Sequence, residues 1–196
     1  MSLVVLTGAV RSGKSAAAEG LAASRGLPVV VAVAGWDGDA EMSRRIAAHQ
    51  ADRPASWTTI ATTTDPAWLE SVPSHAVLVL DCVGTLVSNA CYERIGDAEI
   101  ASADDEAAVH AAADALVAAL IARVGDTIVV TNETGWGVVP AWPSARVFRD
   151  VLGRANRALI DAADAAYLVI DGRFLDLRDL PTQPSWPTDE SEANRD

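Results

Sequence analysis

The sequence predicts a single α/β domain whose mostly parallel sheet is flanked by helices and carries an antiparallel hairpin at one edge. Short, continuous apolar runs alternate with Ala-rich segments of helical length. Strands buried on both faces of a parallel sheet have such runs, and helices connect them. At 196 residues the chain can bury one core and is too short for two ordinary enzyme domains.

The first half of the chain contains three predicted strands and two predicted helices. Leu3 to Thr7 is a β-branched strand, and Ser15 to Ser24 is an Ala-rich helix. Pro28 to Ala34 is a second buried strand. Asp39 to Gln50 is predicted to be helical, and Val77 to Leu80 is a third buried strand.

The second half continues the alternation and then ends in two consecutive strands joined by a two-residue turn, Asp171-Gly172. The turn predicts the antiparallel hairpin. The predicted elements are the helix Asp104 to Arg123, closed by Gly125, the strand Thr127 to Thr131, the helix Val147 to Ala163, and the strands Ala166 to Ile170 and Arg173 to Leu177.

The last residues have a different composition. From Asp179 onward, prolines and acidic residues leave little apolar surface to bury. We therefore expect one catalytic domain over residues 1–178 and a disordered acidic, Pro-rich tail over residues 179–196. Trp186 is the only sign that the tail docks.

Charge and hydropathy exclude several classes of protein. The net charge of −12 argues against a general nucleic-acid binder, which presents a basic face. No apolar run approaches the roughly 20 residues of a transmembrane helix. The N-terminus lacks the features of a signal peptide, and Cys82 and Cys91 have no metal-type spacing. We expect reduced thiols and a cytoplasmic location.

A glycine-rich loop directly follows the first predicted strand and precedes the first predicted helix. It matches G-x-x-x-x-G-K-[ST], in which backbone N–H groups and a lysine surround the phosphates of a nucleotide. Its residues, all expected to bind nucleotide, are Gly8, Ala9, Val10, Arg11, Ser12, Gly13, Lys14 and Ser15. Lys14 is the only lysine in the chain. The alternative is an ordinary Gly-rich turn, which would need neither a strand before it nor a helix after it. We therefore predict a P-loop NTPase of the RecA-like kind.

Two residues are predicted to hold Mg²⁺ with the nucleotide. The Ser15 hydroxyl occupies the metal-ligating position of the loop, and Asp81 ends the third predicted strand, where P-loop enzymes place a second ligand. The alternative for Asp81 is a carboxylate that stabilises a turn at the strand end.

The helix predicted from Asp39 carries Arg45 and His49 at positions i and i+4, on one face with Met42 and Ile46. In isolation, this pattern also fits a histidine near the end of an amphipathic helix, with Arg45 solvated.

A wider set of residues resembles the bifunctional adenosylcobinamide kinase/adenosylcobinamide-phosphate guanylyltransferase family of cobalamin biosynthesis. The match spans about residues 3 to 177 and is most distinctive in N-E-x-G-x-G-[IV]-V-P followed by R-x-F-R-D. Beside the glycine loop, the matching residues are Glu41-Met42, Arg45-Ile46, His49, Arg53-Pro54, Trp57, Asp81-Cys82, Ser88-Asn89, Thr131 to Pro140, Arg146 to Asp150, Gly153 and Asn156.

The resemblance implies two reactions at one nucleotide site. Adenosylcobinamide first receives the γ-phosphoryl group of ATP or GTP. His49 then carries GMP from GTP as a covalent intermediate and transfers it to the phosphorylated corrinoid. Arg44, Arg45 and Arg53 would supply positive charge. The resemblance also implies a homotrimer, and it extends the nucleotide contacts to Val33, Ala34, Gly35, Gln50, Ala51, Asp52 and Arg53.

Glu133 is expected to orient the substrate hydroxyl or help position Mg²⁺, because ligands bind at the carboxyl ends of strands. The alternative is an acidic residue that only shapes a Gly-rich loop. The sequence departs from the family at Ala34, Ala61 and Val83-Gly84, which puts its base and ribose contacts in doubt. A kinase without guanylyl transfer and a noncatalytic GTP-binding switch remain alternative functions.

Overall fold

The computed structural model describes residues 1–34 and 53–184 of the chain. The helix predicted from Asp39 to Gln50 and the end of the predicted tail lie outside these residues.

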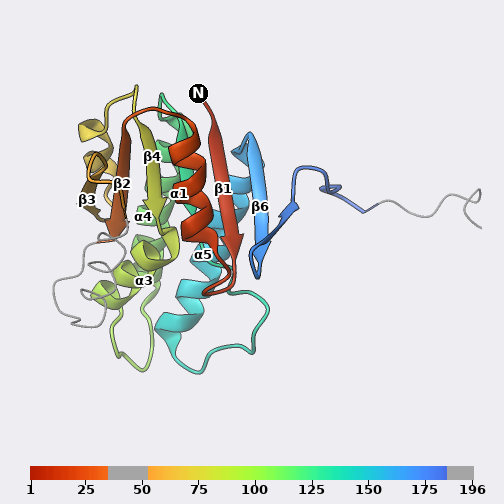
Figure 1. Ribbon diagram of the computed structural model, residues 1–196. Helices are drawn as coiled ribbons and strands as arrows, with labels where there is room; N and C mark the ends of the chain where they lie inside the picture. The colour runs from red at the N-terminus through yellow and green to blue at the C-terminus, as the bar shows by residue number, and fades with distance from the viewer. Residues whose placement is uncertain (35–52, 185–196) are drawn as a thin grey trace, which may run out of the picture.

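The core of the structure is a seven-stranded sheet with the order β3-β2-β4-β5-β1-β6-β7 (Figure 1). All neighbouring strands run parallel except β6 and β7, which form the antiparallel hairpin at the edge. The predicted sheet and hairpin are thereby confirmed. The strands are β1 (Leu3–Gly8), β2 (Val29–Ala34), β3 (Thr58–Thr62), β4 (Val77–Asp81), β5 (Thr127–Val130), β6 (Ala165–Ile170) and β7 (Arg173–Asp176).

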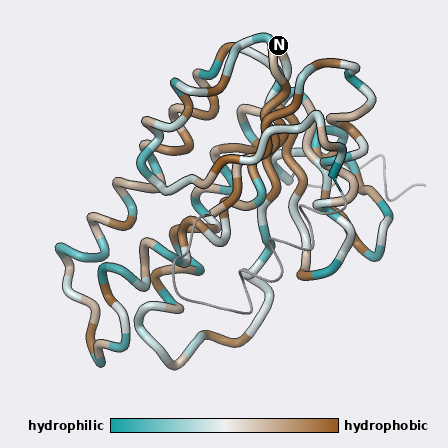
Figure 2. Tube along the Cα trace, turned by 60° about the vertical axis from the view of Figure 1, so that its left-hand side comes forward, coloured by the Kyte–Doolittle hydropathy of each residue, from teal (hydrophilic) through white to brown (hydrophobic). Residues whose placement is uncertain are grey.

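Both faces of the sheet are buried under helices. Successive residues of β2 point to opposite faces and show this. Val31 packs in the core beneath α1 (Lys14–Ser24), whereas Ala32 packs in the core of the opposite face. On that opposite face, α3 (Val83–Arg94), α4 (Ala103–Ala122) and α5 (Pro143–Ala162) pack against one another. Figure 1 shows α1 in front of the sheet, and Figure 2 shows the hydrophobic strands in the interior of the molecule.

The predicted helices α1, α4 and α5 are confirmed, with one difference at the start of α5. This helix begins at Pro143, one turn before the predicted Val147. Proline is favoured in the first turn of a helix because the N–H that it lacks would have no helical partner there. From the sequence, the segment before Val147 is expected to be a loop, because its prolines are more typical of loops than of helices.

Three elements have no counterpart in the sequence analysis: β3, α3 and the short 3₁₀ helix η1 (Pro66–Ser71). The strand β3 is a Thr-rich strand that, within residues 1–34 and 53–184, pairs with β2 alone, and it lacks the apolar run of a central strand. The helix α3 follows β4 without a Gly or Pro boundary and is capped by the sulfur of Cys82. Seven of its twelve residues are buried, which removes the polar face of an amphipathic helix.

The parallel arrangement brings the carboxyl ends of β1, β4 and β5 to one edge of the sheet. At this edge lie the glycine loop, Asp81 and the start of the segment after β5. Within residues 1–34 and 53–184, no helix has the length and apolar character needed to cross a membrane.

Candidate nucleotide-binding site

The backbone of the glycine loop adopts conformations that favour glycine. Gly8 ends β1 with φ of 143°, and a Cβ at this position would lie 2.3 Å from the carbonyl oxygen of Val169 in β6. Gly13 has φ of 100° at the N-cap of α1. The two glycines of the motif are thus needed for backbone geometry, Gly8 because β6 passes directly behind it.

The turn between β6 and β7 holds the loop from outside. The N–H of Gly172 donates to the carbonyl of Ser12 over 2.9 Å. The Ser12 and Thr7 hydroxyls are buried and have no hydrogen-bond partner within the described residues. The C-terminal hairpin therefore fixes the main chain of the loop, while two buried hydroxyls beside it stay available.

Lys14 lies inside the curve of the loop. Its side chain donates to the carbonyls of Gly8 and Ala9, over 2.8 and 2.6 Å, and the residue is only 6% exposed. Burial lowers the pKa of Lys14, and the charges of Cys82 and Asp81 oppose this effect. The ammonium group is therefore held at the centre of the loop by carbonyl oxygens that a phosphate can replace.

Asp81 is close to the loop because of the strand register. It pairs with Val130 of β5, which pairs in turn with Leu6 of β1. Two strand spacings, about 10 Å, separate the β4 and β1 backbones. The charge of Asp81 favours the protonated form of Lys14 and so raises its pKa, against the effect of burial.

The available ligands fit Mg²⁺ in its usual nucleotide-bound form. Among the described residues there is no cluster of three His, Cys, Asp or Glu side chains that would form an all-protein metal cage. Mg²⁺ bound to a nucleotide needs no such cage, because phosphate oxygens and waters complete its octahedron beside one or two protein oxygens. Ser15 at the start of α1 and Asp81 at the end of β4 are of this type.

Cys82 and Asn132 join the ends of β4 and β5. The Cys82 sulfur accepts from the Thr85 N–H over 3.4 Å, and burial raises the pKa of this thiol. The Asn132 amide lies 4.0 Å from the same sulfur. A Cβ on Gly84 would approach Asn132 Nδ2 to 3.1 Å, so the glycine that departs from the family pattern permits this close packing.

A buried amide network positions the segment after β5. Asn156 of α5 accepts from the Thr131 hydroxyl over 2.6 Å and donates to the Asn132 carbonyl over 2.9 Å. The N–H of Glu133 then donates to the carbonyl of Gly8 over 3.1 Å, so this segment contacts the same carbonyl as Lys14. Sequence reasoning gave no role to Asn156, and only the tertiary structure reveals one.

The Glu133 carboxylate accepts from the N–H of Gly135 over 2.6 Å. This bond shapes the Gly-rich loop, which is the alternative role considered for Glu133. The second carboxylate oxygen stays available for another partner. The role of Glu133 in substrate positioning stays a prediction.

Arg53 is placed on the flank of α1. Its Nε donates to Glu19 over 2.8 Å, its side chain is almost fully buried, and Nη1 has no partner within the described part of the chain. Val33 and Ala34 end β2, with Val33 paired to Asp81. The other predicted contacts, Arg44, Gly35, Arg45, His49, Gln50, Ala51 and Asp52, lie outside the described residues.

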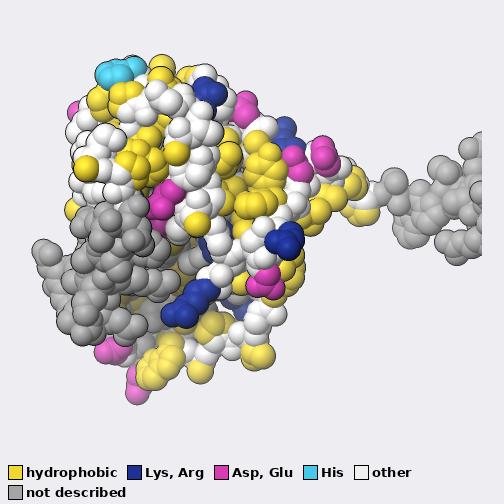
Figure 3. Space-filling model, in the orientation of Figure 1, with side chains coloured by type: hydrophobic (Ala, Val, Ile, Leu, Met, Phe, Trp, Pro, Cys, Tyr) yellow, Lys and Arg dark blue, Asp and Glu magenta, His cyan; other side chains and the backbone are white. Residues whose placement is uncertain are grey.

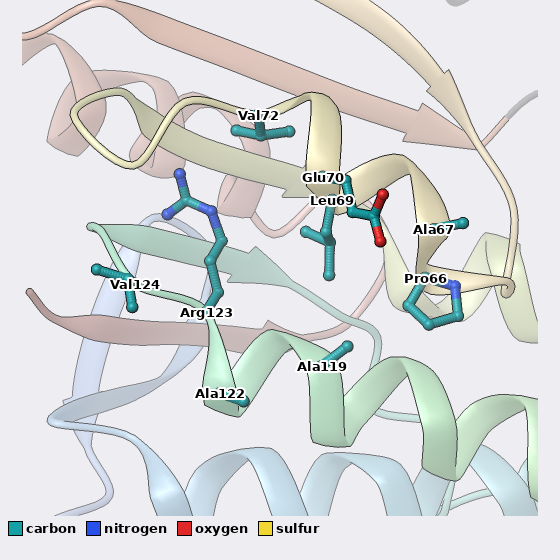
Figure 4. A pocket seen from close by; sticks show the side chains of 9 residues that line it. All are labelled: Pro66, Ala67, Leu69, Glu70, Val72, Ala119, Ala122, Arg123 and Val124. Carbon is teal, nitrogen blue, oxygen red and sulfur yellow. The ribbon is translucent and has the colours of Figure 1, made fainter.

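A separate cavity of about 490 Å³ lies between η1 and the end of α4, toward the amino ends of the strands (Figure 4). Arg123 lines it, but its guanidinium already donates to the carbonyls of Pro73, Ala76 and Asp126 and to the Thr127 hydroxyl. These bonds hold loops at the base of the sheet. Four of the hydrogen bonds that this guanidinium can donate are therefore already used within the protein.

Solved structures share this fold at low sequence identity. An ATPase from the type III secretion system of pathogenic bacteria aligns with 85% of this chain and 50% of its own, with a TM-score of 0.51 and 13% identity. The Pyrococcus horikoshii OT3 protein PH0250 aligns over 89% of this chain and 85% of its own, with a TM-score of 0.50 and 8% identity. The predicted P-loop NTPase fold is confirmed.

Sequence relatives are much closer. The bifunctional adenosylcobalamin biosynthesis protein CobU is 34% identical in Escherichia coli, strain K12, and 36% identical in Salmonella typhimurium, in each case over 87% of this chain and 96% of the relative. The corresponding Pseudomonas aeruginosa protein, CobP, is 33% identical over 90% of this chain and 98% of its own. Residues 4–177 match the family described as cobinamide kinase / cobinamide phosphate guanyltransferase. The chain belongs to this family.

Proposed function

We propose that this protein phosphorylates adenosylcobinamide and then converts the product to adenosylcobinamide-GDP, using one nucleotide site for both reactions. The observation that carries the proposal is the position of Lys14, buried within the glycine loop and close to Asp81. Family membership supplies the acceptor, since the relatives are named for adenosylcobalamin biosynthesis.

In the first reaction, the hydroxyl oxygen of the aminopropanol arm attacks the γ-phosphorus of ATP or GTP. The bond from that phosphorus to the β,γ-bridging oxygen breaks, the nucleoside diphosphate leaves, and the hydroxyl proton is released. Lys14 would exchange its bonds to Gly8 and Ala9 for bonds to the β- and γ-phosphates. Glu133 has one carboxylate oxygen left to orient the hydroxyl.

Ser15 and Asp81 would hold Mg²⁺ in this site. When bound, the ion neutralises charge on the phosphate oxygens. The buried Ser12 hydroxyl, which has no partner within the described residues, is a further donor for the phosphates. The spare Nη1 of Arg53 supports a role beside the nucleotide on the flank of α1.

In the second reaction, a neutral nitrogen of His49 attacks the α-phosphorus of GTP and pyrophosphate leaves. The resulting phosphoramidate is attacked by a phosphate oxygen of adenosylcobinamide phosphate, the P–N bond breaks, and His49 is regenerated. Arg45 would stabilise the charge on the α-phosphate. The family resemblance supports the role of His49, and the position of Arg45 four residues before it supports the role of Arg45.

Incubation with GTP labelled at the α-phosphate tests the guanylyl step. We expect label on the denatured wild-type protein, its release by added adenosylcobinamide phosphate, and no label on His49→Ala. His75→Ala is the matched control, since His75 is an exposed histidine in the turn before β4. Wild-type protein that never retains label, while still phosphorylating adenosylcobinamide, would leave a kinase without guanylyl transfer.

A further inference from the structure

The loop between β5 and α5 exposes four large apolar side chains within seven residues. They are Trp136, Val138, Val139 and Trp142, which are 83%, 94%, 61% and 63% exposed, and together they form what we term the 136–142 apolar patch. Exposed apolar side chains concentrated in one loop mark a candidate interaction site. This loop lies at the lower right of the molecule in Figure 1, and Figure 3 shows exposed apolar side chains in that region.

Hydrogen bonds from α5 hold the main chain of this loop. Arg146 donates to the carbonyls of Pro140 and Ala141, over 3.2 and 2.6 Å, and Arg149 donates to the carbonyl of Gly137 over 3.4 Å. The two guanidinium groups thus bind main-chain oxygens beneath the patch. The apolar side chains are presented to solvent by a supported main chain, which lowers the entropy cost of binding a ligand there.

The loop that carries the patch begins at the nucleotide site. Its loop starts at Glu133, whose N–H is bonded to the Gly8 carbonyl at the base of the glycine loop. Only two residues separate Glu133 from Trp136. A substrate whose hydroxyl reaches the γ-phosphate has its body over the surface that leads away from Gly8, and this loop forms part of that surface.

The chemistry of the loop disfavours an anionic occupant. Residues 134–145 contain no charged side chain, in a protein whose net charge is −12. A second nucleotide or an anionic partner would find no cation there among the patch side chains. A corrinoid matches, because it carries no negative charge and is a broad macrocycle with apolar edges and amide groups, far larger than the arm that carries its reactive hydroxyl.

We propose that the 136–142 apolar patch binds the macrocycle of the corrinoid acceptor and so sets the affinity for that substrate. The inference rests on the proposed function. It makes Val138 and the two tryptophans specificity-determining residues that act on the acceptor and leave the nucleotide untouched.

The test introduces a charge into the patch and a matched charge elsewhere. Val138→Asp is compared with Val124→Asp. Val124 is 67% exposed in the loop before β5, at the amino end of that strand, whereas the patch follows its carboxyl end. We expect Val138→Asp to raise the KM for cobinamide by about tenfold or more, the effect of losing a modest contact free energy. Its KM for nucleotide stays within about twofold of wild type. Val124→Asp leaves both constants unchanged, and Trp136→Ala repeats the Val138→Asp result without adding a charge.

Sedimentation velocity distinguishes a substrate surface from a contact between copies of the chain. A raised cobinamide KM with an unchanged sedimentation coefficient supports the proposal. A changed sedimentation coefficient in Val138→Asp assigns the patch to a second copy and overturns it, as does an unchanged cobinamide KM. If wild-type protein phosphorylates neither cobinamide nor adenosylcobinamide, the proposed function itself is wrong, which is a distinguishable outcome.

Discussion

Replacing Gly8 with alanine tests the geometry on which the nucleotide site depends. The new Cβ would lie 2.3 Å from the carbonyl oxygen of Val169, and Gly8 has φ of 143°. A non-glycine residue in such a backbone region costs about 1–3 kcal/mol, and overpacking against the β6 backbone costs about 1–3 kcal/mol more. We expect Gly8→Ala to lower the free energy of unfolding by about 4 kcal/mol.

Thermal unfolding followed by circular dichroism measures this loss. For a chain of this size, each kcal/mol shifts Tm by about 2–4 °C, so we expect a decrease of about 8–16 °C. Gly20→Ala is the control, because Gly20 lies in α1 and nothing approaches its Cβ position within 4 Å. This second substitution should leave Tm unchanged or raise it, since alanine favours helix by up to about 1 kcal/mol.

Binding of nucleotide provides a second readout of the same substitution. Relief of the clash requires the glycine loop or β6 to shift, and either movement displaces the N–H groups that bind phosphate. Gly8→Ala should therefore also lose the increase in Tm that saturating GTP gives the wild type. A Gly8→Ala protein with wild-type Tm and wild-type stabilisation by GTP would refute this reasoning.

Three further substitutions test separate parts of the structure. Lys14→Met should lower kcat/KM for phosphoryl transfer by more than about 100-fold. It should leave the Tm of the nucleotide-free protein nearly unchanged, because burial already destabilises the charged ammonium. A large loss of Tm would contradict this. Asn156→Leu should lower the free energy of unfolding by about 2–3 kcal/mol in urea titrations by stranding the buried Thr131 hydroxyl and a main-chain carbonyl; an unchanged midpoint would show that the network contributes nothing. Burial alone would raise the pKa of Asp126, but the hydrogen bond and charge of Arg25 and the N-terminal ammonium hold it below its ordinary value. Asp126→Asn should therefore cost about 1–2 kcal/mol at pH 7, and the difference from wild type should shrink as pH falls below about 4, where the unfolded carboxyl takes up a proton; a difference independent of pH would argue against the ion pair.

Much of the fold was predictable because central parallel strands carry a local signal. The apolar run of β2 and the strand, glycine loop and helix around Lys14 specify their structure within a few residues. The edge strand β3 has no such signal, since its threonines become a strand only by pairing with β2. The helix α3 was missed because burial between two other helices erases its amphipathic pattern.

The site divides in the same way. The roles of the glycine loop and Asp81 follow from motif and strand position, whereas the contacts that fix them join residues far apart in the sequence. The bonds from Gly172 to Ser12 and from Asn156 to Thr131 belong to this second group. No local pattern encodes them, because they arise only when the β6–β7 turn and α5 pack beside the loop.

The most direct test of the central claim is to incubate the purified protein with adenosylcobinamide, GTP and Mg²⁺ and follow the corrinoid by mass spectrometry. We predict that adenosylcobinamide phosphate forms first and is then converted to adenosylcobinamide-GDP, and that Lys14→Met forms neither. Hydrolysis of GTP by the wild-type protein with an unmodified corrinoid would contradict the assignment of both activities to this site.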